Sequence, residues 1–395
     1  MGFKTHTQES RIGPALLRRI NEQKVLEHLQ IHGPASRAGL RRSSGLTAPT
    51  VSKVVDSLIE KGLLEEIEPT ETRVGRPGKI LRLAGTSAVV LGVLLDAGQC
   101  TVSVAGIDGK IDSRQTRCFV PPSTYAGMLF MLEQACREIL AVVKGTPQGV
   151  AVVINGLIND AEQRVIYCAN LHILDGQDPA GDLGRRLGLR CRVLKGTSAL
   201  CLSERTALAV SDRDNFAVLD MTTGLGLGMI SNGVLITGHS GKGGEIGHVV
   251  VDPEGVRCGC GNRGCLETLA TDAATRRLVS EKVGRNLDLE ETRRLLLNQP
   301  AHYAEIVDRV ARYLAMAAAM VVTMLNPGTL LIHSELFLEP VGNLELVSSW
   351  MFRLGLRASV AECSLKRTSS SKEQAAVAGI IHEITRTWLS GDSPS

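Results

Sequence analysis

The feature that most constrains the fold is a change of pattern near residue 85. From about Ser87 onward, short apolar runs alternate with helical stretches. The apolar runs are AVVLGVLLDAG, TVSVAGID, VAVVING, RVLKG, FAVLDMTTG and GTLLIHS, and the helical stretches include residues 125–143, 272–283 and 304–325. This alternation predicts an α/β fold with mainly parallel sheet and helical crossovers. The length of the segment fits two such lobes with a cleft between them.

The segment before the change has a different pattern. Residues 21–61 are expected to form three short helices, with Asn21, Ser36 and Thr47 at their starts. In the third helix Val51, Val54, Val55 and Leu58 recur at helical spacing and make one apolar face, while Thr50, Lys53 and Ser57 lie on another. Gly45 falls in the turn between the second and third helices, which gives the helix-turn-helix pattern. Residues 63–83 then predict a β-hairpin around TETRVGRPGK, so the whole segment is expected to be a winged helix. A plain three-helix bundle with a linker is the alternative.

The basic residues are concentrated in this N-terminal segment. Residues 1–84 hold fourteen Lys and Arg and nine Asp and Glu, a charge of about +5. The remainder holds 44 − 14 = 30 basic and 41 − 9 = 32 acidic residues, about −2. A basic winged helix is expected to bind double-stranded DNA through phosphates, with its third helix in the major groove. The residues predicted to contact DNA are Thr47, Thr50, Ser52, Lys53, Arg76 and Lys79.

Two of these assignments have alternatives. Thr47 can instead serve only as a helix cap. Arg76 is expected at the tip of the hairpin, where it suits a narrow, A·T-rich minor groove. A flexible basic linker is the other interpretation of that tip.

Three of the ten cysteines need a chemical explanation. Cys258, Cys260 and Cys265 lie within eight residues, and His248 precedes them in the same segment. One imidazole and three thiolates complete a tetrahedral Zn²⁺ site with no open position, which is the structural type. The glycines between the cysteines allow the chain to fold tightly around an ion. Three reduced cysteines in a loop are the alternative.

Several segments together resemble the ROK family, which contains repressors and sugar kinases. The resemblance rests on GEIGH with the cysteine cluster, TTGLGLGMISNGVLITG, SKEQAAVAGIIHEI and the N-terminal segment that ends in VGRPGK. The N-terminal segment is similar to that of the family's repressor branch. The implied fold class is α/β, with an N-terminal winged helix-turn-helix over residues 1–84. An actin-like, two-lobed ROK domain, similar to a sugar kinase, follows over residues 85–395. Its smaller lobe is expected at about 85–203 plus the closing helix at about 371–390, and its larger lobe, with the zinc loop, at about 204–370.

The resemblance also implies an effector site beside the metal. In the family a zinc-bound histidine helps to hold sugar hydroxyls together with nearby acidic residues. Carried over, the implied effector-binding residues are Asn170, Glu245, His248 and Glu267. For Glu245 and Glu267 the alternative is support of the zinc loop.

The same comparison with the family implies that no catalytic residues are present. A sugar kinase needs a carboxylate base, which in the family is the Asp of an Asn-Asp pair that precedes a Glu. Here the pair falls on Lys195-Gly196, ahead of Glu204. The first phosphate loop reads Asp96-Ala97-Gly98-Gln99-Cys100, without the second Gly and the Thr, and His333-Ser334 replaces a Gly-Gly pair on the nucleotide side. Only the run Gly224 to Gly228 remains as a glycine-rich loop. Lys195 would favour an anionic ligand such as a sugar phosphate.

These observations predict a transcriptional regulator, most simply a repressor of carbohydrate uptake or metabolism genes. Its expected partners are a double-stranded DNA operator and a sugar, sugar-phosphate or protein effector, and a homodimer or homotetramer is expected. The chain has no long apolar run and no signal-type start, so we expect it in the cytoplasm. The alternative is an ATP-dependent sugar or amino-sugar kinase with a DNA-binding appendage.

Overall fold

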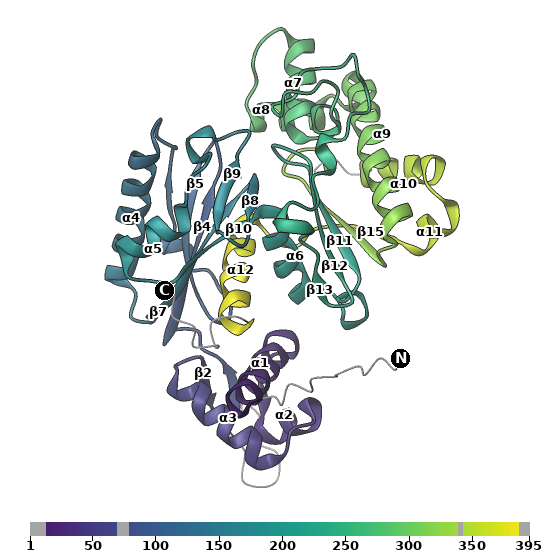
Figure 1. The fold of residues 1–395 in the computed structure, drawn as a ribbon. Helices are drawn as coiled ribbons and strands as arrows, with labels where there is room; N and C mark the ends of the chain where they lie inside the picture. Colours follow the sequence, from purple (N-terminus) through teal and green to yellow (C-terminus); the bar gives the residue numbers. More distant parts are fainter. Residues whose placement is uncertain (1–12, 69–78, 339–342, 387–395) are drawn as a thin grey trace, which may run out of the picture.

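The fold has an N-terminal helical domain below two α/β lobes (Figure 1). It is a computed structural model that describes residues 13–68, 79–338 and 343–386. The helical domain precedes the lobes in the chain, as the change of pattern near residue 85 predicts.

The N-terminal domain is a winged helix. Its elements are α1 (Pro14–His32), β1 (Ala35–Ser36), α2 (Arg37–Ser44), α3 (Ala48–Glu60), β2 (Leu64–Ile67) and β3 (Ile80–Leu83), with strand order β1-β3-β2. The Ser36 side chain caps α2 by accepting a hydrogen bond from the Gly39 N–H at 3.1 Å. Val51, Val54, Val55 and Leu58 are buried, as their spacing predicts.

Two details of this domain differ from the expectation. The first helix begins at Pro14 with Gly13 as its N-cap, so Asn21 lies inside the helix. Pro14 at the first position is compatible with a helix start, because its missing N–H has no intrahelical acceptor there. Ser57 is buried and donates a hydrogen bond to Glu22 Oε1 at 2.8 Å. It therefore joins α3 to α1, whereas Lys53 on the same predicted face is exposed.

The smaller lobe is built on a five-stranded sheet of order β10-β7-β4-β5-β6. Its strands are β4 (Ala88–Leu95), β5 (Cys100–Gly106), β6 (Arg117–Phe119), β7 (Thr146–Ile154) and β10 (Cys191–Lys195). Helices α4 (Tyr125–Val142) and α5 (Pro179–Leu187) share one apolar cluster with one face of this sheet. A separate ribbon of β8 (Leu157–Asn159) and β9 (Arg164–Tyr167) follows β7. The short helices η1 (Ser113–Gln115) and η2 (His172–Leu174) lie in its loops.

The larger lobe repeats the arrangement with strand order β13-β12-β11-β14-β15. Its strands are β11 (Phe216–Asp220), β12 (Gly226–Ser231), β13 (Val234–Leu235), β14 (Thr329–His333) and β15 (Ser364–Arg367). Its helices are α7 (Asp272–Val283), α8 (Leu289–Asn298), α9 (Pro300–Leu325), α10 (Asn343–Leu354) and α11 (Arg357–Glu362), with short turns η3 (Val210–Asp212) and η4 (His239–Gly241).

Both sheets are mixed, so the expectation of mainly parallel sheet is wrong. In each, the central strand has a parallel neighbour on one side and an antiparallel one on the other. The connections after β4 and after β11 span only a few residues. A parallel crossover needs a dozen residues or more, so these connections can only form hairpins.

Helices α6 (Gly196–Ala207) and α12 (Lys372–Arg386) pack against each other between the two lobes (Figure 1), and α12 also lies against β4 and β7. A Cβ atom at Gly92 in β4 would lie 3.0 Å from the Val377 backbone nitrogen, so this glycine permits the close approach of α12. The other end of α12 contacts α1. Val25, Leu26 and Leu29 of α1 belong to the same apolar cluster as Ile381 and Ile384 of α12, so the winged helix and the smaller lobe share one core.

Candidate functional site

The structure brings the predicted metal ligands together. His248 ends η5 (Ile246–His248), and Cys265 immediately precedes η6 (Leu266–Thr268). The candidate ligand atoms of His248, Cys258, Cys260 and Cys265 all lie within 4.8 Å of one another. Gly264 has a φ of 63° and lies so close to the Asp252 carbonyl oxygen that a side chain cannot fit there. This glycine therefore makes the tight return of the loop possible.

The donor set fits a tetrahedral metal ion. The Cys260 and Cys265 sulfur atoms are 3.7 Å apart, and Cys258 Sγ lies 3.6 Å from His248 Nδ1. Zn–S bonds of about 2.3 Å at tetrahedral angles would place neighbouring sulfur atoms roughly 3.8 Å apart. The spacing of these atoms therefore matches a closed site with three thiolates and one imidazole.

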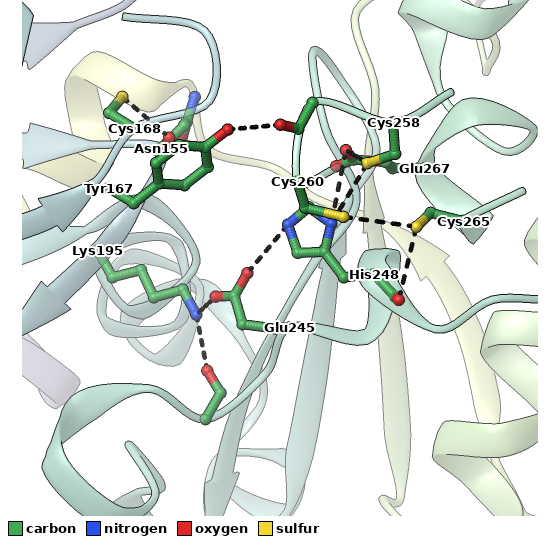
Figure 2. A network of polar contacts seen from close by, with 12 residues as sticks. Asn155, Tyr167, Cys168, Lys195, Glu245, His248, Cys258, Cys260, Cys265 and Glu267 are labelled. Carbon is green, nitrogen blue, oxygen red and sulfur yellow. Dashed lines mark hydrogen bonds and ion pairs between the residues drawn. The ribbon is translucent and has the colours of Figure 1, made fainter. Parts of the chain in front are cut away.

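Two carboxylates flank the cluster, and each contacts His248 (Figure 2). Glu245 Oε2 lies 3.7 Å from His248 Nε2, and Glu267 Oε1 lies 3.6 Å from Nδ1. The Cys258 thiol donates to Glu267 Oε1 at 2.8 Å. Burial, followed by this bond to Glu267, raises the pKa of the Cys258 thiol. A metal-bound histidine usually donates its other ring N–H to a carboxylate or a carbonyl group. Glu245 faces Nε2, the His248 ring nitrogen that points away from the cysteines, and is therefore placed to orient the ring.

The predicted effector residues line one small cavity between the lobes. Asn170, Glu245, His248 and Glu267 all border a cavity of about 80 Å³. Lys195, which ends β10, reaches across from the smaller lobe to the larger one (Figure 2). Its ammonium makes a very short ion pair with Glu245 and donates to the Gly243 carbonyl at 2.7 Å. A ligand that binds Glu245 would therefore share this carboxylate with Lys195 or displace it.

Asn155 takes up the space that the side chain of a catalytic Asp at position 196 would need. Gly196 begins α6, and a Cβ atom there would lie 2.3 Å from Asn155 Oδ1. The Asn155 amide in turn donates to Asp96 Oδ2 at 3.3 Å. An Asp at position 196 would fit only if Asn155 moved. Glu204, which follows on α6, is buried and accepts hydrogen bonds from the N–H groups of Ser369 and Ser370 at 2.9 and 2.7 Å.

Five backbone N–H groups in the loops after β4, β11 and β14 donate to the protein's own carboxylates. Gly98 N–H donates to Asp96 Oδ1 at 3.1 Å, and Thr222 N–H donates to Asp220 Oδ1 at the same distance. After β14, Asp272 accepts from the N–H groups of residues 335, 336 and 337 at 2.7, 3.1 and 2.8 Å. Burial raises the pKa of Asp272 to about 6.

The four predicted DNA-contacting residues of α3 lie at its N-cap and in its first two turns. Thr47 is the N-cap, and its Oγ1 lies 2.8 Å from Thr50 Oγ1. Ser52 is half-buried, and its carbonyl accepts from Arg37 Nη1 at 3.4 Å. Lys53 is exposed and forms no ion pair with any described residue. The first turn of α3 therefore offers hydroxyl groups and one cation to a partner.

The base of the wing is held to α2 and α3 by ion pairs. Glu66 accepts from Lys79 at 2.8 Å and from Arg37 at 3.0 Å, and Arg37 also pairs with Asp56 of α3 at 2.8 Å. The hydrogen bond to Glu66 raises the pKa of Lys79. Lys79 thus has a partner within the domain. Arg76 lies outside the described residues.

Sequence reasoning missed several residues of the interlobe site. Tyr167 donates from its hydroxyl group to the Gly259 carbonyl at 2.7 Å and so joins β9 to the cysteine loop. Tyr167 lies in the YCANLH segment that also contains Asn170. An aromatic residue so close to a predicted effector-binding residue could have indicated that Tyr167 belongs to the site. Asp220, which lines the cavity, was missed as well, together with Lys372, which pairs with it at 3.3 Å. An Asp that ends a wholly apolar strand and a Lys that opens a helix rich in small apolar residues are both unusual enough to notice.

Comparisons with known proteins agree with this arrangement. The ROK family profile matches residues 91–382, and a MarR family profile matches residues 24–73. The chain is 25% identical over 340 residues to the DNA-binding transcriptional dual regulator NagC of Escherichia coli, which covers 81% of this chain and 82% of that protein. It is 29% identical over 258 residues to a glucokinase of Thermotoga maritima, over 62% of this chain and 80% of that one.

A solved structure has the same fold over nearly the whole chain. It is that of a ROK family transcriptional regulator described as a homologue of the E. coli MLC protein. The TM-score is 0.79 at 22% identity, over 95% of this chain and 98% of that one. In the described ranges, no helix combines the length and the apolar character that crossing a membrane requires.

Proposed function

This chain belongs to the ROK family, and on that premise we propose that it is a DNA-binding transcriptional regulator, a repressor of carbohydrate uptake or metabolism genes. The observation that carries the proposal is the combination of a winged helix with kinase-like lobes whose catalytic positions are filled. Gly196 leaves no carboxylate at the base position, and Asn155 takes the space beside it. The similarity to NagC over both parts of the chain supports the same function.

In this proposal α3 lies in the major groove of a double-stranded operator. Thr47, Thr50, Ser52 and Lys53 at its N-terminal end would contact bases or phosphates. Arg76 and Lys79 of the wing would contact the neighbouring minor groove or backbone. Because Lys79 is paired with Glu66, we assign it a weaker contribution than Lys53.

We assign the cysteine cluster to one structural Zn²⁺ ion, held by His248, Cys258, Cys260 and Cys265. When bound, the ion would fix the loop that carries Glu245 and Glu267, because both carboxylates contact His248. The effector would then be bound by Asn170, Glu245, His248 and Glu267, through carboxylates that accept directional hydrogen bonds from hydroxyl groups.

Lys195 sets a condition for that effector. It pairs with Glu245, and both residues line the cavity. A sugar hydroxyl would donate to a remaining lone pair of Glu245 beside Lys195, and an anionic group on the ligand would pair with the Lys195 ammonium. A protein effector would not need to enter the cavity. We further propose that the regulator acts in the cytoplasm as a homodimer or a dimer of dimers, since two-fold operators are read by two winged helices.

The runner-up function is an ATP-dependent sugar or amino-sugar kinase, and the similarity to a glucokinase is the observation that favours it. The test is ATP turnover by the purified full-length protein with glucose, N-acetylglucosamine, N-acetylmannosamine and xylose. We expect no turnover above that of a buffer control, while a ROK glucokinase assayed in parallel is active. Sugar-dependent ATP turnover by the wild-type protein would overturn the regulator as the sole function and favour the kinase.

A further inference from the structure

A crevice between the winged helix and the lobes has the size of a small-molecule site. Its volume is about 550 Å³, against about 80 Å³ for the cavity beside His248. Pockets that bind small molecules usually measure about 300–1,000 Å³. The walls come from the end of α1, from β3, from the turn after β5, and from α6 and α12, where α1 lies below α12 in Figure 1. A molecule bound there would contact the winged helix and the lobes at the same time.

Arg205, near the end of α6, borders the crevice and has almost no partner in the protein. Within the described part of the chain, Asp214 is the one carboxylate that pairs with it, at 3.9 Å from Nη2. Asp214 is itself 64% exposed, and solvent weakens such a pair. The Arg205 guanidinium makes no hydrogen bond to a described residue, and its buried Nε has no acceptor among them. A guanidinium carries five N–H donors in a fixed fork, so Arg205 can still bind an anion through two of them.

Two uncharged side chains on the walls have hydrogen-bonding groups that no described residue uses. They are the imidazole of His382 on α12 and the amide of Gln30 on α1. Burial, followed by the charges of Arg386 and Arg205, lowers the pKa of His382 to about 3, so this ring is neutral at pH 7. A neutral imidazole and an amide each offer a donor and an acceptor. The crevice therefore offers hydrogen bonds to a ligand from the lobe side and from the winged-helix side.

The remaining charged groups on the walls decide which ligand fits. Arg82 and Lys110 each already lie within 3.5 Å of a carboxylate. Glu27 of α1 accepts from Gln23 at 3.1 Å and pairs with no described cation. Its free lone pairs can accept hydrogen bonds from hydroxyl groups. A matching ligand therefore carries one anionic group for Arg205 and hydroxyl groups for Glu27.

We propose that the crevice is a second small-molecule site and that it binds a small hydroxylated metabolite whose phosphate or carboxylate pairs with Arg205. The bound ligand bridges α6 and α12 to α1 and favours one orientation of the winged helix against the lobes. The inference goes beyond the proposed function, which places the effector in the cavity beside His248. It does not depend on that assignment, because none of the described residues borders both sites.

The first experiment asks whether the anionic group is required. Isothermal titration calorimetry with the full-length protein measures the binding of glucose 6-phosphate, gluconate and glucose. We expect at least one of the two anions to bind about tenfold more tightly than glucose, or better, because glucose lacks the charge-assisted bond to Arg205. The tighter of the two anions identifies phosphate or carboxylate as the preferred group. No preference for either anion over glucose would overturn the proposal.

Three variants ask where the preferred anion binds. Arg205→Met should weaken its binding about tenfold or more. Arg114→Met removes an exposed guanidinium that lies outside the crevice and pairs with Asp112 at 2.9 Å, and it should leave the binding unchanged. Lys195→Met removes the cation of the cavity beside His248 and should also leave the binding unchanged. Weaker binding in Lys195→Met together with wild-type binding in Arg205→Met would place the anion in that other cavity and contradict a second site.

A crevice-filling variant keeps the test decisive if Arg205→Met does not fold. Ala378 of α12 is half-buried and borders the crevice. Ala378→Phe leaves every charge in place, and we expect it to weaken binding of the anion about tenfold or more because the added ring takes the ligand's space. Wild-type affinity in Ala378→Phe would exclude the crevice as the binding site.

Amide hydrogen exchange locates the bound anion without any substitution. We expect slower exchange in the last two turns of α1 and in α6 when the anion is added, because a ligand stabilises the segments that it bridges. Slower exchange confined to residues 243–267, which contain the cysteine cluster, would contradict the proposal. None of these readouts uses DNA, so a negative result leaves the proposed regulator function standing.

Discussion

Lys53 is the exposed cation in the first half of the helix that we place in the major groove. Each phosphate contact of a bound protein releases counterions, which makes the logarithm of the binding constant fall with the logarithm of the salt concentration. We expect Lys53→Ala to weaken DNA binding similarly on all sequences and to reduce the salt slope by about one unit. The measurement is fluorescence anisotropy over a salt series.

A matched control is Lys24→Ala, which removes the same charge from the exposed side of α1 in the same domain. It should change the salt slope less than Lys53→Ala does. If both variants lower the slope equally, Lys53 acts only through the net charge of the domain and does not contact the backbone.

Cys260 is the exposed member of the metal cluster, and its replacement tests the zinc assignment. Cys260→Ser should release the metal and destabilise the larger lobe, because the binding free energy of a structural ion is part of the folding free energy. Elemental analysis should find one zinc per wild-type chain and much less in the variant. The exposed Cys118, which is outside the cluster, gives the control variant Cys118→Ser. A wild-type protein free of zinc under non-chelating conditions would end the assignment.

A site residue could be predicted from the sequence only where its partners lie close to it in the chain. Three cysteines within eight residues, with a histidine just before them, can be recognised as one site because the loop itself brings them together. The lysines at positions 195 and 372 could not be assigned in this way. Their partners Glu245 and Asp220 are distant in sequence, and only the meeting of the two lobes brings each pair within contact.

At the scale of elements, a buried carboxylate joins the first and third helices of the winged helix. Glu22 of α1 is 1% exposed, accepts from Ser57 at 2.8 Å and pairs with Lys61 at 2.7 Å and Arg18 at 3.2 Å. Burial alone would raise the pKa of Glu22, but the bonds to Lys61, Ser57 and Arg18 together lower it. The ionised carboxylate therefore stabilises the contact between α1 and α3.

The sign of the pH effect follows from this lowered pKa. The stabilisation is fully present above the unfolded pKa of about 4.3 and is lost as the pH falls through the lower folded pKa. Glu22→Gln should reduce the free energy of unfolding of the winged helix by roughly 1–3 kcal/mol at pH 7, with a smaller difference at acid pH. Thermal unfolding of the wild type and the variant between pH 7 and pH 3 checks this. A difference that grew towards acid pH would contradict the role of Glu22.

The elements themselves were largely predictable, and the exceptions have a common cause. Helix α7 was predicted with its observed bounds, and the central strands β4, β7, β11 and β14 were each visible as apolar runs. Strand direction was not visible, because apolar runs in parallel and antiparallel pairs look alike when both faces of a sheet are covered. The connections after β4 and β11 are too short for a parallel crossover, so their lengths could have indicated the antiparallel pairs. The start of α1 was misplaced because Asn21 resembles a cap, while the helix continues to Pro14.

At the scale of the whole molecule, we expect more than one winged helix to bind each operator. One small DNA-binding module gives limited contact area, and two-fold operators match two-fold proteins. We expect a mass of about 85 kDa or a multiple of it by light scattering at micromolar concentration, twice the 42.3 kDa of one chain. A strictly monomeric species, with and without DNA, would count against the expected homodimer or dimer of dimers.

We propose that the winged helix directs this chain to specific DNA sites, and genome-wide mapping of its binding is the sharpest test of that proposal. The full-length protein is mapped beside a variant in which Thr50 and Lys53 are both replaced by Ala, which leaves the lobes and the metal cluster untouched. The account predicts a limited set of sites that share a two-fold sequence near carbohydrate genes, and their loss in the variant. Binding without sequence preference, or the same sites in both proteins, would contradict it.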